Sequence, residues 1–332
     1  MTARGGAAAV AAALLLAACS GSSRPPHAAL PPAPSRSPST GVAPTSTTVP
    51  TGPTPCSPTR PQPAGLSTVT MSYQGQDRTY ALYVPASYSG TTSVPVVFEF
   101  HGYSSNAFQQ VVYGDFRPLA DRDGFVIVAP NGQGRDQHYN LTREPGLQDD
   151  VAFVGAVADR VESQLCVDRR RIYATGMSDG GAMTSALACG AAGRFAAFGP
   201  VAAELYLPTC AAGRDVSIAA FHGTADPIVP FKGGGVSCCG SPTLGSAPDA
   251  MAGWAGHDGC AQQFTDTRLS PQVIERQWSG CHPGTEVRFY MIQGGGHTWP
   301  GSKIALGPLG LTTNEISATD TLWAFFQAHP LT

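Results

Sequence analysis

One stretch of the sequence constrains the fold more than any other, because it requires a strand, a sharp turn and a helix in direct succession. The apolar run Arg171–Met177 leads into Ser178, which Gly176 and Gly180 flank in the pattern Gly-x-Ser-x-Gly. Glycines at these two positions let a strand turn into a helix without a side chain striking the backbone. Small residues at 182–188 continue as a helix. The pattern predicts Ser178 as a nucleophile on an exposed turn, and a turn that merely contains a serine is the alternative.

The rest of the chain alternates predicted strands and helices. Helical spacing of apolar residues predicts helices at 149–165 and 317–328, and a Gly-containing turn joins two short runs at 67–73 and 78–85 as a hairpin. Nearly continuous apolar runs are typical of parallel strands that are buried on both faces. Such runs lie at 94–100, 124–130, 195–203, 216–223 and 286–292. We therefore predict an α/β fold with a mostly parallel central sheet, helices on both faces and a leading antiparallel hairpin.

The amino terminus is typical of an export signal. Arg4 precedes the apolar run 7–18, which is too short to span a bilayer but suits a signal peptide. The run ends at Leu-Ala-Ala-Cys, which resembles the bacterial lipoprotein signal. We expect a signal peptide at 1–18 and a lipid on Cys19, so that the exported protein is anchored to the outer face of the cell membrane or released. An ordinary secretory signal with a chance cysteine is the alternative.

The segment 19–63 is rich in Pro, Ser and Thr and has almost no periodic apolar pattern. Such a composition cannot bury enough surface to offset the entropy of ordering. It predicts a disordered tether, followed by a catalytic domain at 64–332. The net charge of −3 and the 13% share of charged residues argue against nucleic acid as a partner, because a phosphate-binding face needs many clustered Lys and Arg.

Cysteine usage fits an oxidising compartment. Beyond Cys19 the chain holds an even number of cysteines, which allows four disulfides without choosing among their pairings. Zinc is the competing interpretation, but two adjacent cysteines lack the spacing of paired zinc ligands, and we expect no metal. Proximity along the chain suggests the pairs Cys56–Cys166 and Cys189–Cys210, and places Cys238 and Cys239 opposite Cys260 and Cys281.

A nucleophilic serine needs a histidine that takes its proton and a carboxylate that orients this histidine. In open parallel sheets such groups follow the carboxyl ends of strands. Asp226 lies three residues after Gly223, which ends a predicted strand, and His297 lies in a glycine-rich loop after the last predicted strand. We predict Asp226 as the orienting acid and His297 as the general base. The order Ser178, Asp226, His297 is that of α/β-hydrolases.

Other acids and histidines are weaker candidates. Asp215 precedes a strand, and Asp249 lies in a loop far from any strand end. His101 and His222 directly precede glycines, a position that suits the shaping of a loop. A purely structural role, as an Asp-Pro turn or a buried histidine, is the non-catalytic interpretation of the two predicted partners.

Two backbone N–H groups are predicted to stabilise the oxyanion of such a reaction. One belongs to Asp179, the residue after the nucleophile, and the other to Tyr103, in the loop after the strand at 94–100. Neither contact depends on the identity of the side chain.

From about Thr68 to its end, the chain resembles the polyhydroxybutyrate depolymerase and feruloyl esterase family of α/β-hydrolases, within carbohydrate esterase family one. The resemblance implies an α/β-hydrolase fold, ester hydrolysis without a cofactor, and catalytic roles for Ser178, Asp226 and His297. The segments that carry it are His101-Gly102, Pro130-Asn131-Gly132, Asp149–Phe153, Cys166–Ser178, His222–Pro230 and Gly294–Gly301.

Two positions depart from the family pattern: Asp179 stands where the family usually has Asn, and Tyr139 where it often has Trp. These departures concern the choice of ester substrate rather than the reaction. A serine peptidase of the prolyl oligopeptidase type and a non-catalytic envelope lipoprotein are the competing functions. The first usually carries a large extra domain that is not visible in the sequence, and a complete set of three catalytic residues argues against the second.

Overall fold

The computed structural model of the chain describes residues 53–141, 146–206, 210, 212–239 and 242–332. The predicted signal peptide, Cys19 and most of the predicted tether lie outside the described residues. Among the residues described, no helix is long and apolar enough to cross a membrane.

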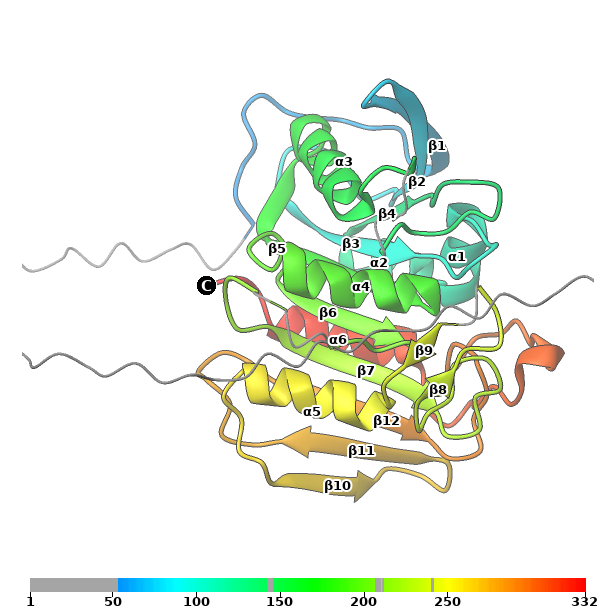
Figure 1. Cartoon of the computed structure of the whole chain (residues 1–332). Helices are drawn as coiled ribbons and strands as arrows, with labels where there is room; N and C mark the ends of the chain where they lie inside the picture. Colours follow the sequence, from blue (N-terminus) through cyan, green and yellow to red (C-terminus); the bar gives the residue numbers. More distant parts are fainter. Residues whose placement is uncertain (1–52, 142–145, 207–209, 211, 240–241) are drawn as a thin grey trace, which may run out of the picture. The chain divides into compact units, whose positions relative to one another are not determined.

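A mixed sheet of ten strands runs through the domain in the order β1-β2-β4-β3-β5-β6-β7-β12-β11-β10 (Figure 1). Its centre is parallel and almost wholly buried, as the apolar runs predict. The hairpin of β1 (Gly65–Tyr73) and β2 (Gln76–Val84) joins it in antiparallel fashion through β4, which confirms the predicted fold. The parallel strands are β3 (Val94–Phe100), β4 (Val126–Pro130), β5 (Val167–Met177), β6 (Ala197–Val201), β7 (Ser217–Gly223) and β12 (Val287–Ile292).

The far edge of the sheet was not predicted from the sequence. There β11 (Val273–Trp278) and β10 (Phe264–Arg268) continue the sheet beyond β12 in antiparallel fashion. All five residues of β10 are exposed, so this strand has no buried face to impose an apolar pattern on its sequence. A separate small ladder pairs β8 (Gly234–Gly235) with β9 (Thr243–Leu244).

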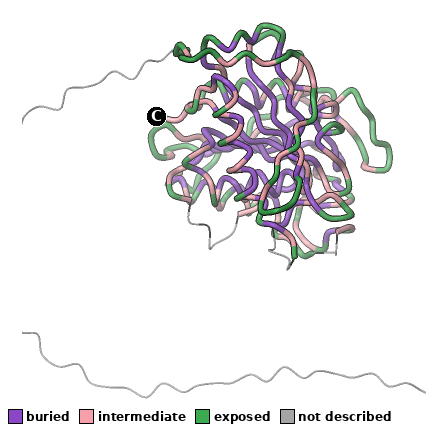
Figure 2. Tube along the Cα trace, turned by 90° about the horizontal axis from the view of Figure 1, so that it is seen from above, coloured by how far each residue is buried: buried purple, intermediate pink, exposed green. Residues whose placement is uncertain are grey.

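Helices cover both faces of the sheet, and each face has its own buried core (Figures 1 and 2). One layer holds α3 (Asp150–Gln164), α4 (Asp179–Gly190) and α5 (Ala247–His257). The other holds α1 (Ala107–Gly114), α2 (Arg117–Asp123) and α6 (Ala318–Ala328). A short 3-10 helix, η1 (Gly307–Leu309), precedes α6. The parallel strands end at one edge between the two layers, where loops can build a site.

The packed part of the chain begins before the predicted boundary at residue 64. Thr54 hydrogen-bonds with Ser93, and the Arg60 guanidinium donates to the carbonyl oxygens of Glu162 and Leu165. Cys56 forms a disulfide with Cys166. These contacts hold a polar segment that has no apolar pattern of its own.

Four disulfides are present among the described residues, and two of them have the expected partners. These two are Cys56–Cys166 and Cys189–Cys210. The expectation that Cys238 and Cys239 face Cys260 and Cys281 is wrong, because the structure joins Cys238 to Cys239 and Cys260 to Cys281. The first of these pairs lies in the loop between β8 and β9, whereas the second connects the end of α5 to the turn after β11.

Candidate active site

Ser178 lies on the predicted turn between β5 and α4. Its backbone has φ 59° and ψ −122°, a strained conformation that non-glycine residues rarely adopt. A Cβ at position 176 would lie 2.6 Å from the carbonyl oxygen of Phe100, and one at position 180 would lie 2.0 Å from it. Only glycine fits at either position, as the sequence pattern predicts.

His101 is fully buried and fixes the peptide between Gly102 and Tyr103. Its Nε2 accepts the N–H of Gly132 at 2.9 Å, so its Nδ1 is the donor to the Gly102 carbonyl oxygen, 2.8 Å away. Burial lowers the pKa of His101 to about 4, which keeps the ring neutral. The Ser105 N–H also donates to the Gly102 oxygen. Because C=O and N–H point in opposite directions in a trans peptide, the Tyr103 N–H is directed away from these donors.

The Gly102–Tyr103 peptide adjoins the serine. A Cβ on Gly102 would lie 3.4 Å from the Ser178 Cβ, and Tyr103 and Ser178 line the same cavity. Asp179 follows Ser178 as the first residue of α4. Backbone N–H groups in the first turn of a helix have no partner within the helix, which suits them to binding an anion.

The side chains of Asp179 and Tyr139, the two residues that depart from the family pattern, lie behind the turn rather than in the cavity. The Asp179 carboxylate accepts the Tyr139 N–H at 2.8 Å, and burial raises the pKa of Asp179 to about 6. Tyr139 is buried, packs edge-on against Phe100 and donates its hydroxyl to the carbonyl oxygen of Pro130. Neither side chain lines the cavity beside Ser178.

Asp226 and His297 come together at the ends of β7 and β12. His297 Nδ1 lies 2.8 Å from Asp226 Oδ2, and both side chains are almost fully buried. The other carboxylate oxygen of Asp226 accepts the N–H groups of Ile228 and Val229 at 2.8 and 2.9 Å. The predicted acid is therefore held from both sides, with one oxygen left for the histidine.

A second histidine and carboxylate lie behind Asp226: His222, which the sequence suggested only as a loop-shaping residue, and Glu204, which the sequence reasoning missed. His222 Nδ1 is 2.6 Å from Glu204 Oε2, and Nε2 is 2.9 Å from the Val229 carbonyl oxygen and 3.5 Å from Asp226 Oδ2. Burial disfavours the charged ring, but the charge and hydrogen bond of Glu204 outweigh burial and raise the pKa of His222 to about 9. The imidazolium thus places a positive charge beside the Asp226 carboxylate. Glu204 follows β6, so its position at a strand end was the available signal.

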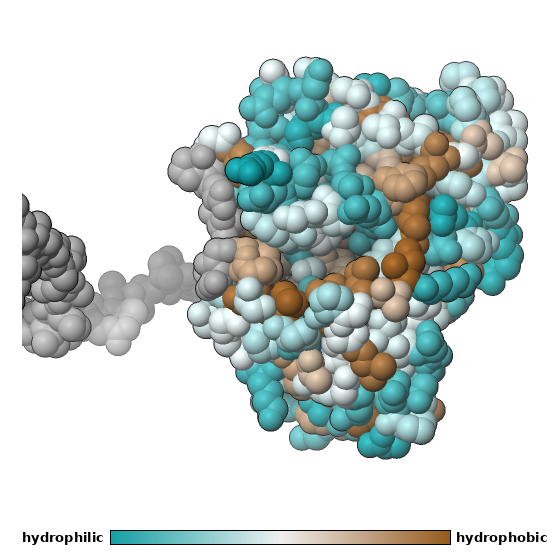
Figure 3. All heavy atoms as spheres, turned by 90° about the vertical axis from the view of Figure 1, so that its right-hand side faces the viewer, coloured by the Kyte–Doolittle hydropathy of each residue, from teal (hydrophilic) through white to brown (hydrophobic). Residues whose placement is uncertain are grey.

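A cavity of about 550 Å³ contains Ser178 and His297 at the edge where the parallel strands end. Figure 3 shows this side of the molecule, where apolar side chains gather around a hollow. Phe108, Ile304 and Leu306 line the cavity and are exposed by 61%, 39% and 38%, so its mouth is apolar as well. The aromatic residues of its wall are Tyr103, Phe108 and Tyr113.

Sequence comparison relates the chain to fungal esterases. The esterase PHB depolymerase family model matches residues 78–230. A probable feruloyl esterase C of Aspergillus niger is 30% identical over 269 residues, which cover 77% of this chain and 86% of the fungal protein. Feruloyl esterase C of Emericella nidulans is 29% identical over 262 residues, which cover 76% of this chain and 84% of that protein.

Comparison with solved structures shows that esterases share the fold of this chain. An acetyl xylan esterase of Aspergillus awamori superposes with a TM-score of 0.56 at 15% identity, over 80% of this chain and all of the other. A thermostable esterase superposes with a TM-score of 0.54 at 16% identity, over 80% of this chain and 63% of that one. The chain therefore belongs to the esterase PHB depolymerase family of α/β-hydrolases, a family of serine esterases, and is homologous to the fungal feruloyl esterases C.

Proposed function

We propose that Ser178, His297 and Asp226 form the catalytic triad of this carboxylic-ester hydrolase. The observation that carries the proposal is the buried 2.8 Å contact between His297 Nδ1 and Asp226 Oδ2, with His297 in the same cavity as Ser178. A carboxylate on Nδ1 fixes the ring tautomer and stabilises the imidazolium that forms when the other nitrogen takes a proton.

In the proposed reaction, Ser178 Oγ attacks the ester carbonyl carbon while His297 takes the hydroxyl proton. The oxyanion is bound by the N–H groups of Asp179 and Tyr103, and the latter is oriented by the bonds on the Gly102 oxygen. The acyl–oxygen bond then breaks, and His297 returns the proton to the leaving alcohol. A water molecule, deprotonated by His297, releases the acid from the acyl-enzyme and restores Ser178. No cofactor takes part in these steps.

The proposed substrate is an ester of an aromatic acid, of the hydroxycinnamoyl type. Three aromatic side chains and a largely apolar wall surround the nucleophile, and they suit a planar aromatic acyl group. The names of the fungal relatives point to the same class. A short acetyl group would leave much of the wall uncovered.

Steady-state turnover of methyl ferulate, p-nitrophenyl acetate and a soluble hydroxybutyrate oligomer, by the wild type and by Asp226→Asn, tests the proposed substrate class and the proposed triad. We expect the highest kcat/KM on methyl ferulate. Asp226→Asn should lower kcat on the order of 10⁴-fold, because the ring loses its orienting charge. A full rate in Asp226→Asn would mean that another acid holds His297, whereas a preference for the oligomer would overturn the substrate assignment alone.

The proposal includes export from the cell with a lipid on Cys19. The disulfides among the described residues fit an oxidising compartment outside the cytoplasm. The signal-like sequence that ends at Cys19 supplies the attachment point. Mass spectrometry of the mature amino terminus should find a diacylglyceryl cysteine that Cys19→Ser lacks, and an unmodified amino terminus downstream of Cys19 would exclude the anchor.

A further inference from the structure

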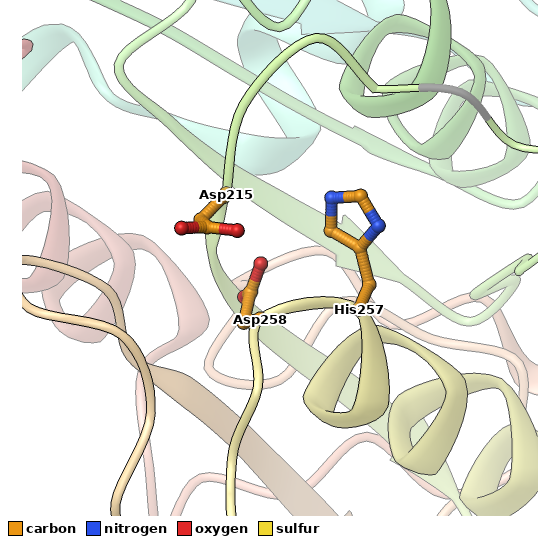
Figure 4. Close-up of side chains that lie close together, drawn as sticks. All are labelled: Asp215, His257 and Asp258. Carbon is orange, nitrogen blue, oxygen red and sulfur yellow. The ribbon is translucent and has the colours of Figure 1, made fainter. Parts of the chain in front are cut away.

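Asp215, His257 and Asp258 converge at the end of the domain opposite the cavity. Each of the three offers one oxygen or nitrogen atom, and these atoms lie within 4.8 Å of one another. Figure 4 shows the two carboxylates and the imidazole facing a common space beside the end of α5. Asp215 precedes β7, whereas Asp226 follows it. Because β7 spans seven residues, at roughly 3.3 Å each, the cluster lies on the order of 20 Å from the triad.

The Asp258 carboxylate is the feature that indicates a bound ligand. Asp258 is fully buried, and its Oδ1 accepts the Val216 N–H at 2.9 Å. Its Oδ2 is also buried and has no hydrogen-bond partner among the described residues. A buried carboxylate oxygen without a partner is costly, because water no longer solvates its charge.

Arg214, the residue directly before Asp215, does not neutralise the cluster. The Arg214 guanidinium donates to backbone carbonyl oxygens and to neither carboxylate of the cluster. His257 Nε2 donates to the Arg214 carbonyl oxygen, 3.2 Å away, and an ion bound at this nitrogen would replace that hydrogen bond. His282 Nδ1 lies 2.9 Å from Asp215 Oδ2. Carboxylates that bind a metal ion are commonly hydrogen-bonded by a second residue in this way.

We propose that Asp215, His257 and Asp258 bind a divalent transition-metal ion, with Zn²⁺ as the fitting ion and a coordination position left for water. Two carboxylates and one imidazole suit Zn²⁺, which accepts oxygen and nitrogen ligands together, whereas Ca²⁺ and Mg²⁺ prefer oxygen alone. The ion would provide the charge that the buried oxygen of Asp258 lacks. It would also connect the start of β7 to the end of α5, next to the Cys260–Cys281 disulfide. The disulfide-bonded cysteines are not among the ligands.

Zinc titration of the chelator-stripped full chain tests the site by calorimetry and thermal unfolding. We expect one Zn²⁺ per chain and a rise in Tm of several degrees on saturation, because a ligand that binds only the folded state stabilises it. Asp258→Asn keeps an acceptor for the Val216 N–H but loses the charge, and it should weaken Zn²⁺ binding at least tenfold. His257→Ala should do the same. Asp249→Asn, the same change at the exposed start of α5, is the matched control and should bind as the wild type does.

A second measurement needs no variant. Co²⁺ bound by the wild-type chain should give a visible d–d absorption band that Zn²⁺ displaces. The proposal is overturned if the wild type takes up no Zn²⁺, or if Ca²⁺ binds and Zn²⁺ does not. Equal Zn²⁺ binding by wild type, Asp258→Asn and His257→Ala would also overturn it, because the ion would then occupy another group such as the triad histidine.

Discussion

His222 carries a positive charge behind the proposed triad, because both of its ring nitrogens face acceptors. Its folded-state pKa of about 9 lies above the usual value of 6.5. The stability that this charge contributes is fully present below about pH 6.5 and is lost as the pH rises through about 9. The charged ring thus stabilises the Asp226 loop at neutral pH, and this contribution decreases in alkaline solution.

Replacing Glu204 by Gln removes the anion that holds this proton, so the pKa of His222 should fall. We expect the Tm of the wild type to drop more steeply than that of Glu204→Gln between pH 6.5 and pH 9 in calorimetry. Burial raises the pKa of Glu99 to about 8. Its ionisation therefore also lowers the stability of the folded state as the pH rises from about 4.5 to about 8, but it does so equally in both proteins. Parallel curves of Tm against pH would show that Glu204 does not set the charge of His222.

The functional role of a single residue could be predicted from the sequence where the residue directly follows a recognisable strand. Asp226 and His297 follow apolar strands, and the glycines around Ser178 mark the turn. Glu204 also follows a strand, but nothing in its local sequence shows that β7 brings His222 beside it. Asp258 looks like an ordinary helix-end residue, and its burial comes from segments far away in the chain.

The close packing of α4 against β3 depends on Gly180, where any side chain would meet the backbone of β3. In Gly180→Ala the new Cβ would lie 2.0 Å from the Phe100 carbonyl oxygen, so α4 must move and carry Ser178 with it. We expect a loss of stability of about 1–3 kcal/mol or more, together with a large loss of esterase activity. Urea unfolding and turnover measure the two effects.

Gly155→Ala in α3 is the matched control, because its Cβ meets no atom within 4 Å. Alanine favours a helix over glycine, so this variant should gain roughly 0.5–1 kcal/mol and keep full activity. Comparable damage in both variants would contradict a specific role for the contact of Gly180 with β3.

The elements that sequence patterns predicted are those with a buried face. The parallel strands carry continuous apolar runs, and α3 and α6 carry helical spacing. By contrast, β10 is fully exposed, and β8 and β9 have two residues each, too few for any period. The sheet therefore extends further than its sequence pattern indicates.

For the molecule as a whole, two disulfides should differ sharply in their effect on stability. Cys56–Cys166 closes a separation of 110 residues, so it restricts the unfolded chain strongly, by about 4–5 kcal/mol in a chain-entropy account. Cys238–Cys239 joins adjacent residues and restricts almost nothing. Replacing the first pair by Ser should lower Tm by roughly 10 °C, whereas replacing the second should barely change it. Equal losses in calorimetry would show that loop closure is not the source of the stabilisation.

The most direct test of the account is labelling with a fluorophosphonate probe, which reacts only with an activated serine. We predict one label per chain, located on Ser178 by peptide mapping, with labelling abolished in Ser178→Ala and strongly slowed in Asp226→Asn. No labelling of the wild type, labelling at another serine, or equal labelling of wild type and Ser178→Ala would contradict the proposal that Ser178 is the nucleophile.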